Sequence, residues 1–267
     1  MPETVKPETV TPETLLGVAI KTLQTAQFEA AFCAWVQACV PFDNITTLAY
    51  FQNQPPKCLM SQSIKAMAHK NIDTIYLAGA YLLDPFHELH ITGAPRGLYR
   101  LSDIAPDRFQ RNRYFLDYYR NTTMVDEIGF VGYPAKSVSI HVCLGRDSHS
   151  GQRFSNRVLA TAARMVPVVT ALAERHWSGL NSTGTYTEVD IVARLMAAVT
   201  QAHDVSLSPR QAEVAVLILR GHSSVSIGLR LGISTQTVKV FRKQLYRKCK
   251  ISSQAELFNL MLPLLVA

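Results

Sequence analysis

Apolar and basic side chains separate onto two faces when residues 234–250 are placed on a helix. The apolar face carries Val238, Phe241, Leu245 and Cys249. The opposite face carries Gln236, Lys239, Val240, Lys243, Arg247 and Lys250. Ser234 is a good N-cap, and Gly232 supplies the turn before it. The pattern predicts a helix that packs on a small core and presents cations to phosphates and base edges, unless that face is merely solvated.

The segments around this helix predict further short helices. Ser208 and Gln211 have the spacing of a capping box, with Pro209 at the first helical position between them. Gly221 ends that helix, and Ser253 starts the last one. The four predicted helices cover 208–221, 223–231, 234–250 and 254–264. The tight turn between the second and third gives helix-turn-helix geometry, so we expect residues 205–267 to form an all-α four-helix domain.

The preceding part of the chain mixes helical and strand-like patterns. Its predicted helices cover 15–40, 63–83, 106–119 and 154–177, and its predicted strands cover 44–51, 58–62, 124–131 and 136–144. The last strand alternates best, with Val138, Ile140, Val142 and Leu144 on one face. This order predicts an α+β sensory domain over 15–177, an antiparallel sheet with flanking helices. A linker and a connector helix at 187–202 are expected within 178–204, and the Pro-Glu-Thr repeat predicts a flexible tail over 1–14.

The charge of the chain is concentrated at its end. Residues 205–267 hold nine Lys/Arg against two Asp/Glu, so this segment carries the whole formal net charge of +7. That asymmetry favours a polyanionic partner for the last domain. The five cysteines have no metal-ligand spacing, which is typical of reduced thiols in the cytoplasm. No run approaches the roughly 18 apolar residues of a membrane span, and no secretion signal is present, so a membrane partner is not expected.

The run LSPRQAEVAVLILRGHSSVSIGLRLGISTQTVKVFRKQLYRKCKISSQAEL at 207–257 resembles the LuxR-type (GerE-like) DNA-binding domain of bacterial transcription regulators. The resemblance implies that Lys239, Val240 and Lys243 read bases. It implies that Thr237, Arg242, Tyr246 and Lys248 touch phosphates or support the helix. The implied DNA-binding set is Ser234, Thr235, Gln236, Thr237, Lys239, Val240, Arg242, Lys243, Tyr246 and Arg247.

The same resemblance implies dimerisation through the fourth helix, around Leu257, Leu260 and Met261. Three positions depart from the family pattern. Phe241 and Gln244 stand where His and Asn are common, so no operator sequence can be inferred by analogy. Gly228 stands where Ala is usual, which costs on the order of 1 kcal/mol of helix stability.

The N-terminal domain resembles two kinds of sensory domain. By layout it resembles GAF/PAS-like domains. It also partly resembles the autoinducer-binding domains of quorum-sensing LuxR proteins, because Tyr76 and Tyr81 precede the Asp84-Pro85 pair. Trp35 and Trp177 lie far from that position, which argues against binding of an acyl-homoserine lactone. The candidate ligand-binding residues are Tyr76, Tyr81, Asp84, Tyr114, Tyr118 and His141.

Other chemistries find little support in the sequence. His87 and His90 lie beside carboxylates, but their spacing is not that of a helical zinc motif and no third ligand is evident. Ser139, His141 and Asp147 are close in sequence, yet alternate strand residues are poor evidence for a catalytic triad. His141 itself either points into a pocket with Ser139 or lies on a wet face. No phosphate-binding glycine loop or phosphate-receiver pattern appears, so we expect no enzyme activity, no metal and no cofactor.

These patterns predict a cytoplasmic transcription regulator that binds double-stranded DNA as a homodimer. A small molecule bound to the N-terminal domain would control it, and RNA polymerase would be a further partner. Two alternatives remain. The chain is a constitutive DNA-binding factor whose N-terminal domain only dimerises or docks a protein, or it is an acyl-homoserine-lactone receptor.

Overall fold

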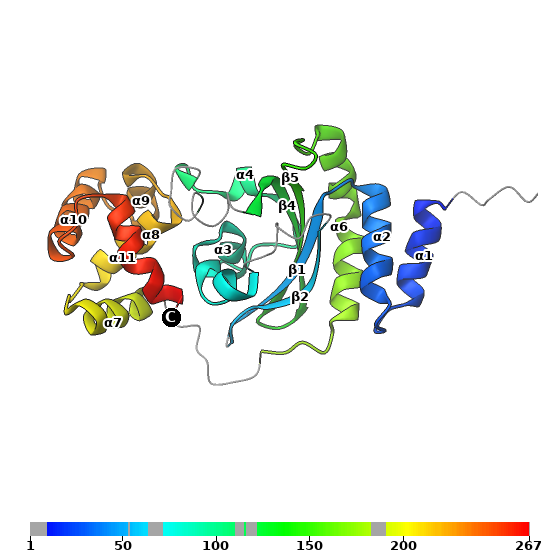
Figure 1. The fold of residues 1–267 in the computed structure, drawn as a ribbon, viewed down its shortest axis with the longest axis horizontal. Helices are drawn as coiled ribbons and strands as arrows, with labels where there is room; N and C mark the ends of the chain where they lie inside the picture. The colour runs from blue at the N-terminus through cyan, green and yellow to red at the C-terminus, as the bar shows by residue number, and fades with distance from the viewer. Residues whose placement is uncertain are drawn as a thin grey trace, which may run out of the picture.

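The computed structural model describes residues 10–52, 54–63, 72–109, 115, 122–182 and 191–266. It contains an α+β part followed by a helical part (Figure 1). The predicted fold class, an antiparallel sheet with flanking helices and then an all-helical domain, is confirmed. Within the described residues, no helix is both long enough and apolar enough to cross a membrane.

The described strands form one five-stranded antiparallel sheet in the order β2-β1-β5-β4-β3. The strands are β1 (Asn44–Phe51), β2 (Lys57–Ser63), β3 (Gly97–Arg100), β4 (Met124–Ala135) and β5 (Val138–Asp147). β1 has the predicted bounds, β4 extends beyond its predicted end, β5 begins and ends later than predicted, and β3 was not predicted. β4 and β5 form a hairpin whose turn includes Ser137 at φ 61°.

α1 (Pro12–Lys21) packs against α2 (Phe28–Cys39), and α2 and α6 (Asn156–His176) cover one face of the sheet (Figure 1). The apolar alternation of β5 faces them, with Ile140, Val142 and Leu144 in one core with Phe28 and Phe32. The prediction of a single helix over 15–40 was wrong, because the chain turns between α1 and α2 with Gln24 at φ 59°. α1 also begins at Pro12, so the end of the predicted tail is helical; residues 1–9 lie outside the described part.

Short segments cover the other face. They are η1 (Ile72–Tyr76, a π-helical turn), η2 (Ala80–Leu83, a 3-10 turn), α3 (Pro85–Ile91) and α4 (Leu101–Ile104). The prediction of one helix over 63–83 was wrong where it can be followed, because β2 continues through Ser63 and the chain then shows two irregular turns. Residues 64–71 and most of the helix expected over 106–119 lie outside the described residues. Both sheet faces are covered, so the wet-face interpretation of His141 was wrong: its side chain is fully buried.

The C-terminal helices are α7 (Ile191–His203), α8 (Pro209–Arg220), α9 (Ser224–Leu231), α10 (Thr235–Lys248) and α11 (Gln254–Val266). The predicted capping box is present, with the Gln211 N–H donating to Ser208 Oγ at 3.3 Å and the Ser208 N–H donating to Gln211 Oε1 at 3.0 Å. Gly221 and Gly232 end α8 and α9 in the left-handed conformation, as their positions require. Local sequence signals therefore account for the helix boundaries here.

Candidate nucleic-acid interface and candidate ligand site

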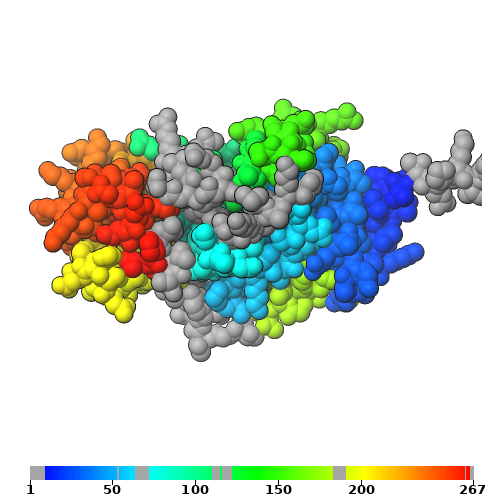
Figure 2. All heavy atoms as spheres, viewed as in Figure 1, coloured from blue at the N-terminus to red at the C-terminus, as the bar shows by residue number. Residues whose placement is uncertain are grey.

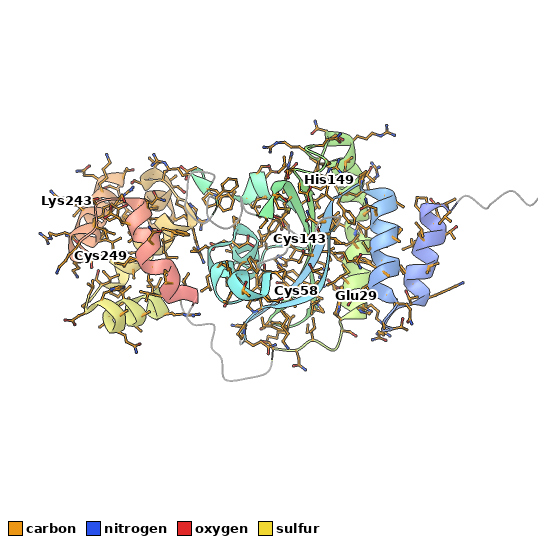
Figure 3. The ribbon with its side chains drawn as sticks, viewed as in Figure 1. Glu29, Cys58, Cys143, His149, Lys243 and Cys249 are labelled. Carbon is orange, nitrogen blue, oxygen red and sulfur yellow. The ribbon has the colours of Figure 1, made fainter. Side chains whose placement is uncertain are left out.

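α10 packs with the predicted face inward. Val238 and Leu245 are fully buried, and Cys249 follows them into the same core. Gln236, Lys239, Val240, Lys243 and Arg247 are all exposed on the other face. Figure 3 shows Lys243 pointing away from the protein, and Figure 2 places α10 at the end of the molecule farthest from α1. The basic face is thus accessible to a large polyanion.

The start of α10 favours negative charge beside it. Ser234 Oγ accepts a hydrogen bond from the Thr237 N–H at 3.0 Å and lies 2.8 Å from Thr237 Oγ1. The first turn contains no acidic residue. The remaining N–H groups and the positive end of the helix dipole are therefore available to a phosphate.

The cations of α10 differ in what they contact. Lys239 and Lys243 make no hydrogen bond or ion pair to the described residues. Arg242 donates from Nε to Tyr246 Oη at 3.1 Å and lies over that ring, 5.2 Å from its centroid. Lys248 instead donates from Nζ to the Ser206 carbonyl at 2.7 Å. Lys248 thus supports the helix and is not free for a phosphate.

Two of the departures from the family pattern have structural explanations. Gln244 Oε1 accepts from Gln211 Nε2 at 3.1 Å, and Gln211 Oε1 also accepts from Lys248 Nζ at 3.0 Å, so a buried amide links α8 to α10. At Gly228, an added Cβ would lie only 2.8 Å from the Ile233 carbonyl oxygen. This glycine therefore permits close approach of the turn to α9, in addition to its cost in helix propensity.

A buried network of polar side chains lies between the sheet and α3. Tyr50 and Tyr76 share a hydrogen bond of 2.5 Å between their hydroxyls, and Tyr76 donates to Asp84 Oδ2 at 2.6 Å. Since the Tyr76 proton goes to Asp84, Tyr50 must be the donor to Tyr76. Asp84 Oδ1 accepts from the Phe86 N–H at 2.9 Å and so caps α3. Burial raises the pKa of Asp84 to about 6, against the lowering effect of these two hydrogen bonds.

Three histidines extend this network. His90 Nδ1 lies 2.8 Å from Ser139 Oγ, which lies 3.1 Å from His141 Nε2. Burial lowers the pKa of His90 to about 4 and that of His141 to about 3, and it lowers the pKa of His87 well below the usual value. All three rings are therefore neutral at pH 7. His141 Nδ1 is buried without a hydrogen-bond partner among the described residues.

The polar cluster, defined here as Tyr50, Tyr76, Asp84, His87, His90, Ser139 and His141, contains three of the six predicted ligand residues, Tyr76, Asp84 and His141. Tyr81 borders it, with its ring 4.9 Å from that of His87. Tyr114 and Tyr118 lie outside the described residues. Asp147 does not join Ser139 and His141, because it lies at the far end of β5 and accepts from the His149 N–H at 2.7 Å. No group of three or more His, Cys, Asp or Glu within the described residues has the arrangement of a metal site.

Sequence reasoning missed Tyr50 and the linking role of Ser139. Tyr50 pairs with Ser139 across β1 and β5, so its position in the cluster depends on the strand register. β1 is buried at all eight positions, and its pattern therefore cannot show which residues face α3. The available signal was the parity of Ser139, His141 and Cys143, opposite to the apolar set of β5.

Comparison with known proteins gives consistent matches. The model of the family described as "Bacterial regulatory proteins, luxR family" matches residues 205–261. The chain is 30% identical over 185 residues to a protein of Aeromonas salmonicida that is described, by inference, as an HTH-type transcriptional regulator in the exeN 3′ region. The match covers 67% of this chain and 93% of that protein.

A solved ligand-binding domain resembles the N-terminal domain in fold. The VqsR LBD domain from Pseudomonas aeruginosa matches with a TM-score of 0.53 at 20% identity, covering 63% of this chain and 98% of that one. SdiA in complex with octanoyl-rac-glycerol matches with a TM-score of 0.41 at 13% identity, covering 94% and 93% of the two chains.

Proposed function

The chain belongs to the luxR family of bacterial regulatory proteins, and from that membership we propose that a small molecule held in the polar cluster controls its binding to duplex DNA. The exposed basic face of α10 is the observation that carries the DNA-binding part of this proposal. In a helix-turn-helix domain, the helix after the turn enters the major groove. α10 is that helix, and its basic face is exposed in the described part of the chain.

We assign base reading to Lys239, Val240 and Lys243. These side chains are exposed on one face of α10, at the spacing that meets successive base pairs in the groove. Phosphate contacts fall to the residues that begin the helix or flank the reading face, namely Ser234, Thr235, Gln236, Thr237, Arg242, Tyr246 and Arg247. The same proposal includes control of transcription in the cytoplasm, with RNA polymerase as a further partner.

The active form is proposed to be a homodimer. α11 supplies the face expected to pair, but Leu257 and Met261 are fully buried within the chain, and Leu260 is half-buried. Dimerisation through this face stays a prediction. Pairing through α11 requires a rearrangement of the chain.

The polar cluster is the proposed effector site. It contains hydroxyl, imidazole and carboxyl groups in a buried position, where each polar group needs a hydrogen-bond partner. His141 Nδ1 lacks such a partner among the described residues and offers one to a ligand. Since the histidines are neutral at pH 7, the cluster suits an uncharged polar molecule with both donors and acceptors.

A genomic occupancy map followed by binding assays tests the DNA-binding part. Fluorescence anisotropy on recovered fragments should show Lys239→Ala weakening the bound complex by about 1–3 kcal/mol and relaxing preference at one base position. Equal weakening on every fragment would assign Lys239 to a phosphate. If the wild-type chain binds no fragment at low ionic strength, the proposed function is wrong.

Thermal unfolding in a metabolite library tests the effector part. A ligand at about 100 times its dissociation constant should add about 2.7 kcal/mol to the unfolding free energy. Tyr76→Phe removes the hydroxyl that joins Tyr50 to Asp84 and should reduce this gain. Tyr99→Phe is the matched control, because its hydroxyl donates to the Pro95 carbonyl outside the cluster. A library without any stabilising compound would favour a constitutive factor.

A further inference from the structure

The short helix α3 contacts both the polar cluster and the DNA-binding domain. Figure 1 shows it between the sheet and the C-terminal helices. Asp84, His87 and His90 lie at its start and along the side that meets the cluster. Glu88 contacts the other domain: its Oε2 lies 2.5 Å from Arg220 Nη1, and its Oε1 lies 3.1 Å from Arg230 Nη1. One carboxylate therefore holds the end of α8 and the end of α9 together.

Further hydrogen bonds surround this double ion pair. Arg220 Nε donates to the Leu82 carbonyl at 3.2 Å, and the Arg108 N–H donates to the Gly221 carbonyl at 3.0 Å. Asp107 Oδ1 accepts from the Ser223 N–H at 2.9 Å. The N-terminal domain thus binds the α8–α9 turn from several sides, directly ahead of the helix-turn-helix pair.

The ion pair between Glu88 and Arg220 is partly shielded from water. The side chains are 22% and 15% exposed, whereas the Arg230 side chain is 46% exposed. Loss of one partner from a shielded pair leaves the other charge poorly solvated, so breaking it costs more than breaking a surface pair. Glu88 and Arg220 are therefore the stronger half of the contact.

The same arrangement covers α11. This helix packs on α7, α8 and η2, and its Leu257, Phe258 and Met261 share a buried cluster with Tyr81 and Leu82 of η2. η2 belongs to the N-terminal domain. While the domains are held together, the side of α11 that contacts η2 is not available to a second copy of the chain.

We propose that Glu88 is a latch that keeps the DNA-binding domain against the N-terminal domain in a monomeric, low-affinity state. The proposal rests on the proposed function and adds the route by which it is regulated. α3 has seven residues, about two turns, so Glu88 moves as one body with His87 and His90. A ligand that displaces those rings displaces Glu88, releases Arg220 and Arg230, and frees α11 to pair with a second copy.

Glu88→Gln in the full chain tests the latch without any ligand. Glu213→Gln is the matched control: it removes the same charge, but from an ion pair within α8, where Arg210 lies 2.7 Å away. Relative to that control, Glu88→Gln should bind operator DNA at least about fivefold more tightly, within the range of couplings between sites. Sedimentation velocity should show it self-associating at concentrations where the control is monomeric.

The outcomes separate the two proposals. If the wild-type chain binds DNA but Glu88→Gln matches Glu213→Gln in affinity and mass, the latch is wrong and the proposed function stands. If no variant binds DNA, the proposed function itself fails. Should Glu88→Gln not fold, Asp107→Ala carries the test, because it removes another bond of the same contact from outside α3. Equal behaviour of Asp107→Ala and the control would also overturn the latch.

Discussion

Two lysines of α10 should have opposite effects when changed to alanine. Lys243 is exposed and makes no hydrogen bond or ion pair to the described residues, whereas Lys248 donates to the Ser206 carbonyl and to Gln211 Oε1. Lys243→Ala should therefore weaken DNA binding and leave stability unchanged. Lys248→Ala should lower stability and leave the electrostatic part of binding unchanged.

The magnitudes follow from counterion release and hydrogen-bond energies. A cation held in the groove releases counterions from the duplex whichever group it touches, at about −0.9 in the slope of log affinity against log salt for each charge, so losing the Lys243 charge should flatten the slope by about that amount. Between 50 and 200 mM salt, this equals a roughly 3.5-fold change in the ratio of affinities. Lys248→Ala removes two partly exposed hydrogen bonds, which should cost about 1 kcal/mol and a few degrees of Tm.

Anisotropy titrations at four salt concentrations and thermal unfolding of the same samples measure both quantities. Lys136→Ala is the control, because Lys136 is exposed in the hairpin turn of the N-terminal domain. If Lys248→Ala flattens the salt slope as much as Lys243→Ala, then Lys248 leaves its intramolecular partners on DNA. The division of the basic residues by their contacts would then be wrong.

Three further results are expected. Asp126 is buried and accepts from Arg100 Nη2 at 2.6 Å, so Asp126→Ala should cost about 3–5 kcal/mol in urea unfolding; a loss under 1 kcal/mol would contradict this. Gly228→Ala should lower Tm despite its better helix propensity, because its Cβ would meet a carbonyl oxygen; a higher Tm would show that the turn adjusts freely. His90 has a lowered pKa of about 4, so stability should fall as pH falls from 6.5 towards 4, while Asp84, with its raised pKa of about 6, opposes this trend. His90→Gln should reduce that loss by about 1.4 kcal/mol per pH unit, measured as unfolding free energies derived from Tm. If wild type and variant lose stability in parallel as pH falls, His90 does not have a lowered pKa.

The C-terminal domain was predictable because its signals are local. The cap at Ser208, the left-handed glycines Gly221 and Gly232 and the cap at Ser234 each specify a boundary within a few residues of sequence. The faces of α10 then follow from helical periodicity. Which cations remain free does not follow, because the partners of Lys248 lie on a segment about forty residues away in the chain.

The N-terminal domain was predictable only in outline. β1 and β5 are long enough for their sequences to identify them as strands. β3 has four residues, too few for any periodicity, and the turns in 72–83 are irregular because they pack on the sheet and do not follow helical propensity. The break near Gln24 uses a positive φ at a residue that gives no such signal. Tertiary packing, and not a local sequence signal, sets β3, the turns in 72–83 and the break near Gln24.

The composition of the two sheet faces argues that the polar cluster serves recognition more than stability. The face under α2 and α6 is filled by apolar side chains such as Phe28, Ile140 and Leu144. The face under α3 buries Tyr50, Ser139 and His141 instead, although apolar residues of similar volume would stabilise a core at least as well. A buried nitrogen such as His141 Nδ1, which has no hydrogen-bond partner among the residues that the structure describes, costs about 1–3 kcal/mol if it stays unpaired. Residues that break the local rules of packing concentrate at functional sites. α3 contacts these buried polar residues on one side and the DNA-binding domain on the other.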